Sequence, residues 1–228
     1  MVMAFVENLP FRNKAFDFVI ASHVLEHSAD PEGFLSELER VAKSGYIEVP
    51  DALMERLNPY LDHRLEITVR DNRLVIRKKR AWREDPEIVE LYEQRAGSII
   101  ADEAIARHPF EFHVRYYWQG SIDYVLVNPE VDASWQAPFS VTPAPKRTAR
   151  QLINTAILSL LRMCLSQRQR NRAIDLLQLL RCPVCHAESL KTVTGNMVCK
   201  NCNQQYPVEV GIPRLISATH AGGGSRHT

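Results

Sequence analysis

Two cysteine pairs near the carboxyl end constrain this chain more than any other feature. The motifs Cys182-Pro-Val-Cys185 and Cys199-Lys-Asn-Cys202 are separated by thirteen residues. Each motif sets two thiolates on a tight turn, and four thiolates complete a tetrahedral zinc site with no position left for water or substrate. A redox dithiol is the alternative, but the presence of two paired motifs argues against it. We therefore predict a structural zinc ribbon with Cys182, Cys185, Cys199 and Cys202 as ligands.

A second informative stretch, residues 16–31, reads as a strand, a polar bend and the start of a helix. Residues 16–21 are almost continuously apolar, which is typical of a strand covered on both faces in a parallel α/β sheet. Ligands of open α/β sheets bind just outside the carboxyl ends of the strands. The polar residues at that end are Ser22, His23, Glu26 and His27. We take these four residues as the candidate catalytic or binding site. The alternative is that they form only a structural bend.

A helix and a second strand are expected next. Asp30 can cap the helix and Pro31 suits its first turn. Its apolar face would consist of Phe34, Leu35, Leu38 and Val41. Residues 45–50 read as another buried strand, with Glu48 pointing to the same ligand edge, and Asp51 then caps a short helix over residues 52–57.

Five motifs in this region resemble the back half of a class I S-adenosylmethionine-dependent methyltransferase, of the type 11-like domain. They are Asn8-Leu-Pro-Phe, Phe16-Asp-Phe-Val-Ile, His23-Val-Leu-Glu-His, Phe34-Leu-x-Glu-Leu-x-Arg-Val and Gly45-Tyr-Ile-Glu-Val-Pro. The resemblance covers Val2 to Pro50 and extends weakly to Pro129. It implies a partial Rossmann-like sheet and cofactor contacts at Asn8, Leu9, Pro10, Ser22 and His23. Because a histidine can act as a general base, His23 is also the candidate base toward an unidentified methyl acceptor.

The resemblance begins at about the family's third strand. The family's Gly-x-Gly cofactor loop has no counterpart, because the first glycine of the chain is Gly33. Phe5 also stands where the family often has an aspartate near the adenine. An N-terminally truncated piece is favoured over a degenerate relative, and whether the chain alone is an enzyme stays open. The rival function is a non-catalytic scaffold whose zinc ribbon binds a methyltransferase or RNA.

Two hairpins and a helix are expected after residue 58. Residues 65–70 and 73–77 alternate about Asp71-Asn72 and predict one hairpin. A helix should run from residue 86 to about 106, and a second hairpin, residues 110–118 with 121–127, should turn at Gln119-Gly120. Asp62-His63-Arg64 has a loose similarity to an acceptor-binding element in some relatives. His63 and Arg64 are therefore candidate acceptor contacts, with a surface ion pair as the alternative.

A proline-rich linker and a basic amphipathic helix are predicted over residues 131–176. No acidic residue lies between Ala133 and Ile174, and the same interval holds seven lysines and arginines. A connecting helix with a solvated basic side is the favoured reading. The alternatives are that this helix contacts RNA phosphates or an anionic membrane surface.

The last domain also resembles a family, over Leu179 to about Ile216. Besides the two cysteine pairs, the motifs on which this resemblance rests are Tyr206-Pro-Val and Gly211-Ile-Pro-Arg-Leu-Ile216. They are similar to the small zinc-binding activator subunit of tRNA and release-factor methyltransferases. That resemblance implies association with a methyltransferase, in the same chain, in a partner or in a homodimer.

The whole sequence thus predicts an α/β protein with a partial Rossmann-like methyltransferase sheet, added β-hairpins, a long basic helix and a small C-terminal zinc ribbon. The expected boundaries are 1–130 for the methyltransferase part, 131–176 for the linker and basic helix, 177–218 for the ribbon and 219–228 for a disordered tail. Five cysteines, four of them in two pairs with zinc-type spacing, together with no signal peptide and no spanning segment, predict a cytoplasmic location. The predicted cofactors are S-adenosylmethionine and structural zinc.

Overall fold

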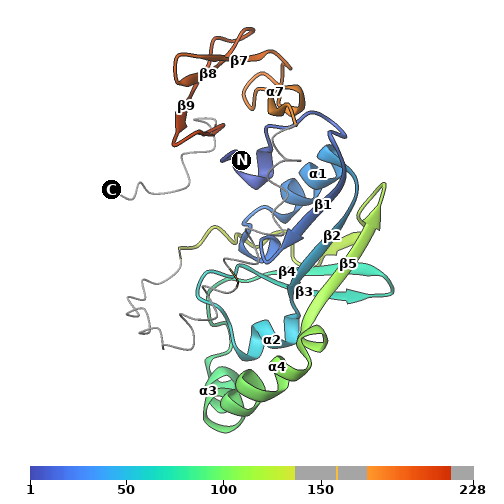
Figure 1. Cartoon of the computed structure of the whole chain (residues 1–228). Coiled ribbons are helices and arrows are strands. Elements are labelled where there is room, and N and C mark those ends of the chain that lie inside the picture. The colour runs from blue at the N-terminus through green and yellow to red at the C-terminus, as the bar shows by residue number, and fades with distance from the viewer. Residues whose placement is uncertain (137–157, 159–173, 217–228) are drawn as a thin grey trace. The chain divides into compact units, whose positions relative to one another are not determined.

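The computed structural model describes residues 1–136, Leu158 and residues 174–216 (Figure 1). The chain divides into two compact units, one formed by Met1–Pro138 with Leu180–Thr228 and the other by Phe139–Leu179. In the second unit the structure describes the short helix α7 (Leu176–Leu179). Most of the predicted basic helix and the predicted tail lie outside the described residues. Within the described part of the chain, no helix is both long and apolar enough to span a membrane.

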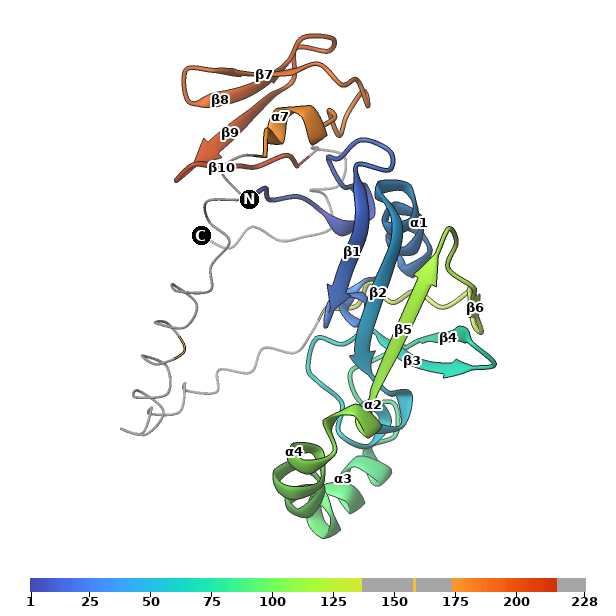
Figure 2. The same cartoon turned by 45° about the vertical axis from the view of Figure 1, so that its right-hand side comes forward.

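The first sheet has three strands in the order β1-β2-β5. Strand β1 (Phe16–Ser22) runs parallel to β2 (Ala42–Pro50), and β5 (His113–Gln119) lies antiparallel on the other edge of β2. The three strands are seen side by side in Figure 2. The predicted parallel pairing of the first two strands is confirmed.

Helix α1 (Pro31–Val41) connects β1 to β2 and covers one face of this sheet. Its start is as predicted, because the Asp30 side chain accepts a hydrogen bond from the Gly33 N–H at 3.0 Å. Its predicted apolar face is also confirmed: Phe34, Leu35, Leu38 and Val41 are all buried. They join the inward-facing side chains of the strands in one core.

The opposite face of the sheet carries exposed apolar side chains. Phe18 and Ile20 of β1 are 49% and 67% exposed, and Tyr117 of β5 is 67% exposed. The prediction that the first strand is covered on both faces was therefore wrong for the part of the chain described. Successive side chains of a strand point to opposite faces. Only the face that carries Ala21 is packed against α1 and the core.

A second sheet has the order β3-β4-β6. Strands β3 (Leu65–Arg70) and β4 (Arg73–Lys78) form the predicted hairpin. Asp71 and Asn72 have φ of 48° and 59°, as a tight two-residue turn with both φ positive requires. Strand β6 (Tyr124–Leu126) then pairs in parallel with β4.

The second predicted hairpin was wrong, because β5 and β6 belong to different sheets. After Gly120, which has φ of 77°, the chain turns away from β5 instead of folding back along it. The Tyr116 hydroxyl accepts a hydrogen bond from the Asp123 N–H at 3.1 Å, and the Glu39 carboxylate accepts one from the Ile122 N–H at 2.5 Å. These contacts divert the segment toward β4.

Short helices fill the connections. Helix α2 (Ala52–Leu57) forms as predicted, with the Asp51 side chain accepting from the Leu53 N–H. The single helix predicted over residues 86–106 is instead interrupted. It consists of α3 (Pro86–Arg95), the π-helical turn η3 (Ile99–Ala104) and α4 (Ile105–Arg107), and the 3₁₀ turn η4 (Pro109–Phe112) leads into β5. Helix α3 ends with Ala96 as its C-cap, directly before Gly97, and a glycine commonly marks an interruption of a helical pattern.

The carboxyl-terminal region is a four-stranded antiparallel sheet in the order β10-β9-β8-β7. Its strands are β7 (Leu190–Val193), β8 (Asn196–Cys199), β9 (Gln205–Glu209) and β10 (Ile212–Pro213). Two loops, before β7 and after β8, carry the four cysteines. We call this region, residues 180–216, the ribbon.

The first residues of the chain pair with the ribbon, which belongs to the same compact unit. Met3 forms a parallel bridge with Arg214, in which the Met3 N–H donates to Pro213 O at 2.9 Å and the Leu215 N–H donates to Met3 O at 2.8 Å. The ladder is limited to Met3 because the chain enters the 3₁₀ turn η1 (Val6–Asn8).

Candidate functional site

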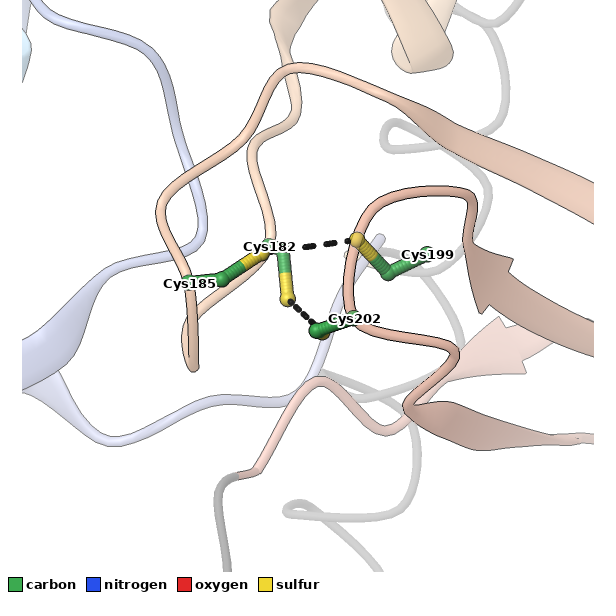
Figure 3. A group of neighbouring side chains, drawn as sticks. All are labelled: Cys182, Cys185, Cys199 and Cys202. Atoms are coloured by element: carbon green, nitrogen blue, oxygen red, sulfur yellow. Dashed lines mark hydrogen bonds between the residues drawn. The ribbon is translucent and has the colours of Figure 1, made fainter.

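The four cysteines of the ribbon converge on one point (Figure 3). The sulfur atoms of Cys182 and Cys202 are 3.7 Å apart, and those of Cys185 and Cys199 are 3.6 Å apart. Tetrahedral zinc with bonds of about 2.3 Å separates its sulfur ligands by about 3.8 Å. The four side chains therefore have the spacing that a closed four-thiolate zinc site requires.

Neighbouring polar groups support this donor set. The Tyr206 hydroxyl, which is buried, lies 3.0 Å from Cys182 Sγ, and burial raises the pKa of Tyr206, so it stays a neutral donor. A hydrogen bond from the Asn201 side chain, followed by one from the Ala187 backbone, lowers the pKa of Cys185 to about 6. Hydrogen bonds of this kind hold thiolates in place around a metal ion. The donor set thus fits zinc in chemistry as well as in spacing.

The turn predicted to touch the cofactor lies against the ribbon. The Asn8 side chain donates to Pro183 O at 3.1 Å, and Pro10 O accepts from the Arg181 N–H at 3.0 Å. Asn8 also lines a cavity together with Pro183 and His186 of the ribbon. The polar groups of this turn are therefore engaged by the same loop that carries Cys182 and Cys185.

Leu9, which lies between Asn8 and Pro10, is held by a charged pair on α1, Glu37 and Arg40. The sequence analysis did not single out this pair. The Leu9 N–H donates to Glu37 Oε2 at 2.7 Å. The Arg40 guanidinium donates to both oxygens of Glu37, at 2.6 and 2.7 Å, and to the carbonyls of Leu9 and Phe11, at 2.8 and 2.6 Å. The signal was present in the helix motif, where Glu and Arg stand three residues apart on one face.

Ser22, His23 and Glu48 meet at the carboxyl ends of β1 and β2, as predicted for Glu48. Ser22 Oγ donates to Glu48 Oε1 at 3.1 Å, and His23 Nε2 lies 3.7 Å from the same oxygen. The His23 N–H also donates to Glu48 O at 2.8 Å. His23 has φ of 54°, a left-handed conformation that is uncommon for a non-glycine residue and is often found at functional sites.

Tyr46 completes this group and was missed, although it stands two residues before Glu48 on the same face of β2. Its hydroxyl donates to the Glu48 carboxylate. Burial and this hydrogen bond raise the pKa of Tyr46 to about 12. The hydrogen bonds from Tyr46 and Ser22 in turn lower the pKa of Glu48. Glu48 is therefore a carboxylate at neutral pH, able to orient a hydroxyl or an ammonium group.

His63 and Arg64, the candidate acceptor contacts, point to different surroundings. His63 is buried, and its Nδ1 lies 2.6 Å from Glu55 Oε2. The Arg64 guanidinium donates to the carbonyls of Ala133 and Trp135 and lies over the Trp135 ring. Only His63 shares a cavity with His23, a cavity of about 380 Å³ at the end of the first sheet. The predicted alternative, a surface ion pair, does not describe His63.

The predicted cofactor contacts therefore lie in two places. Asn8 lines the cavity beside the ribbon, and His23 lines the cavity at the end of β1 and β2. The assignment of Asn8, Leu9, Pro10, Ser22 and His23 to S-adenosylmethionine stays a prediction. So does the role of His23 as a base.

Comparison with known proteins adds two matches. A family model described as a methyltransferase domain matches residues 1–47, and one described as Trm112p-like protein matches residues 174–211. No curated protein and no solved structure matches the chain. The chain thus joins a methyltransferase-domain segment at its front to a Trm112p-like zinc-ribbon segment at its back.

Proposed function

We propose that this chain acts in S-adenosylmethionine-dependent methyl transfer, with its Trm112p-like ribbon serving as a built-in stabilising subunit of the methyltransferase-domain segment. The observation that carries the proposal is the backbone pairing between the methyltransferase-domain segment and the ribbon, residues 180–216. Met3 of the first segment exchanges two hydrogen bonds with the strand end at Pro213 and Leu215. Arg181 and Asn8 add two more between the cysteine loop and the Asn-Leu-Pro-Phe turn.

The buried side chains at this contact support a stabilising role. Leu180 is fully buried and bridges to Phe11, and Leu215 is 1% exposed and follows the strand that pairs with Met3. Burying a leucine side chain contributes roughly 1.5–3 kcal/mol, so these two residues alone are a substantial part of a small protein's net stability. Zinc would hold the loop from which Leu180 and Arg181 project, and metal loading would thereby support the front segment.

S-adenosylmethionine would supply a methyl group activated by its sulfonium charge. The described residues do not by themselves form a full site for it. The Asn8 amide, the Leu9 N–H and the Pro10 carbonyl are already bonded to Pro183, Glu37 and Arg181. A cofactor at this turn would have to replace those bonds or use other groups. We therefore propose that the site is completed by a second copy of the chain or by a methyltransferase partner.

At the carboxyl ends of the strands, we propose that Glu48 and His23 contact the methyl acceptor. The carboxylate of Glu48 is fixed by Ser22 and Tyr46 and stays ionised at neutral pH. His23 lies beside it, with Nε2 3.7 Å from Glu48 Oε1, and would act as the general base that takes a proton from the acceptor group.

Calorimetric titration of the zinc-loaded chain with S-adenosylmethionine, and with its demethylated product, tests the proposal. We expect saturable binding of both ligands, weakened by His23→Ala and unchanged in the control His108→Ala, which removes an exposed histidine. Repeating the titration over a range of protein concentrations, with sedimentation measured in parallel, separates a site completed by a second copy from one within a single chain. Absence of binding at every concentration, with and without added methyltransferase partner, would contradict the catalytic role.

The second candidate function is a non-catalytic scaffold, and one observation favours it. The turn predicted to contact the cofactor is bonded to the ribbon at Asn8 and Pro10, so in this function the front segment serves as the docking partner of the ribbon. This function predicts no binding of S-adenosylmethionine, together with capture of a separate methyltransferase by the zinc-loaded chain and not by Cys182→Ser.

A further inference from the structure

The buried carboxylate of Glu26 stands out among the described residues. Its side chain is 2% exposed, and neither of its oxygens accepts a hydrogen bond within the described part of the chain. A carboxylate taken out of water without donors is costly, and buried polar groups in native proteins nearly always have a partner. Glu26 lies in the 3₁₀ turn η2 (Leu25–His27), directly after the strand end that carries His23. A bound cation would therefore stabilise this buried carboxylate.

Three imidazoles lie near the same oxygen of Glu26. His23 Nδ1 lies 3.5 Å, His63 Nε2 3.9 Å and His27 Nε2 4.0 Å from Glu26 Oε1. Ligand atoms from Glu26, His27 and His63 all lie within 4.8 Å of one another, as a shared metal ion would require. The rings of His27 and His63 are edge to face, with centroids 4.6 Å apart, so both nitrogen atoms can face one point between the rings and the carboxylate.

The other nitrogen of each ring is held by a second carboxylate. His63 Nδ1 lies 2.6 Å from Glu55 Oε2, and the remaining oxygen of Glu55 accepts from Lys79 Nζ at 2.7 Å. His27 Nδ1 lies 3.3 Å from Asp62 Oδ2. Histidines that bind a metal usually donate their other ring N–H to a carboxylate, which fixes the tautomer and leaves the metal-facing nitrogen unprotonated. Both histidines have that arrangement.

We propose that Glu26, His27 and His63 bind a zinc ion, through one carboxylate oxygen and the two Nε2 atoms. Two imidazoles with one carboxylate are a donor set that zinc takes up readily. In a tetrahedral site with bonds of about 2.1 Å, ligand atoms are about 3.4 Å apart, so the distances from Glu26 Oε1 to the two Nε2 atoms would each shorten by about half an ångström on binding. His27, whose side chain is 38% exposed, has the freedom to make that movement.

Three protein ligands leave one coordination position open, unlike the four-thiolate site. The three residues line the cavity of about 380 Å³ at the end of the first sheet, together with His23 and Tyr60. The open position would therefore face the cavity and take an oxygen ligand, either water or a hydroxyl group of a bound molecule. This site is separate from the ribbon, and its existence does not depend on whether the chain transfers methyl groups.

Zinc content of the full chain, measured by mass spectrometry after dialysis against a weak competing chelator, tests the site. We expect two zinc ions per chain in the wild type, and one in Glu26→Gln and in His27→Ala. The matched control His108→Ala should keep two, because it removes an exposed histidine that is not one of the three residues of the cluster. Asp62→Asn should still reach two at saturation, with an affinity for the second ion about 10–100-fold weaker, since it loses only the carboxylate that orients His27.

A spectroscopic measurement locates the second ion independently of protein stability. X-ray absorption at the zinc edge should show nitrogen and oxygen neighbours at about 2.0–2.1 Å in addition to sulfur at about 2.3 Å, and the first set should vanish in His27→Ala. His27 is partly exposed, so this variant keeps its fold even if the buried Glu26→Gln does not. A wild type with one zinc bound only by sulfur would overturn the proposal. So would a second zinc that persists in His27→Ala.

Discussion

The charged pair on α1 gives the sharpest test of how the front segment is held together. Arg40 donates five hydrogen bonds, two to the Glu37 carboxylate and three to Leu9 O, Phe11 O and the Asn13 side chain. The side chains of Arg40 and Glu37 are only 17% and 12% exposed. Replacing Arg40 therefore removes the groups that pin the turn over residues 9–13 to the helix, and leaves Glu37 poorly solvated.

The expected cost follows from that geometry. Removing one partner of a buried ion pair destabilises a protein by about 3–5 kcal/mol, and the partial exposure of this pair lowers the expectation for Arg40→Ala to about 2–4 kcal/mol. Arg40→Lys keeps the charge but loses the planar fork that contacts both oxygens, so we expect about 1–2 kcal/mol. The control Arg107→Ala breaks an exposed pair with Glu103 and should cost less than about 0.5 kcal/mol.

Urea denaturation of the zinc-loaded full chain, followed by tryptophan fluorescence, measures these changes. A double-mutant cycle with Glu37→Gln should give a coupling energy above about 1 kcal/mol, as expected for residues in direct contact. The reasoning is refuted if Arg40→Ala shifts the midpoint no more than Arg107→Ala does. It is also refuted if the cycle with Glu37 shows no coupling.

Three further predictions concern the ribbon and the end of the first sheet. Cys182→Ser should lower the zinc content by one ion and expose the ribbon to proteolysis; unchanged zinc content would contradict the four-thiolate assignment. Val210 is fully exposed with φ of 50°, a conformation that costs a β-branched residue about 1–2 kcal/mol, so Val210→Asn should raise the stability of the zinc-loaded chain by about 1 kcal/mol in urea. A midpoint that falls would show that Val210 has another role. The pKa of Tyr46 is raised from 10.0 to about 12, so its contribution to stability is complete below pH 10 and is lost as the pH rises from about 10 to about 12. Thermal melts across that range should fall less steeply in Tyr46→Phe, and equal slopes would exclude Tyr46 as the source.

Local features of the fold could be predicted because each depends on neighbouring residues. The cap at Asp30 and the apolar face of α1 follow from spacing along one helix, and the Asp71-Asn72 turn follows from the positive φ that such residues tolerate. The path after Gly120 could not be predicted in the same way. It is set by hydrogen bonds that the Asp123 and Ile122 N–H groups donate to Tyr116 and Glu39, and Glu39 lies 83 residues from Ile122 in the sequence. These contacts outweigh the alternating pattern that suggested a hairpin.

Site residues could be predicted where residues of one type recur at short spacing in the sequence. They could not be predicted where the site is assembled from separate segments of the chain. The four cysteines were found because each pair is contiguous. Glu48 was found because it ends a strand, whereas Glu55 was missed because nothing in its own helix α2 marks it as a partner for His63. The apolar content of β1 also led to the wrong prediction that this strand is covered on both faces. Phe18 and Ile20 are apolar but exposed, and strand composition does not reveal which face has a covering layer.

The pairing of Met3 with the end of the ribbon has a consequence for how the assembly responds to dilution. Two segments on one polypeptide meet at an effective concentration on the order of millimolar, set by the linker rather than by expression level. A contact too weak to hold two separate proteins at cellular concentrations would therefore be nearly saturated here. The ratio of ribbon to methyltransferase-domain segment is fixed at one to one, and a ribbon engaged in this way is withdrawn from competition by other partners.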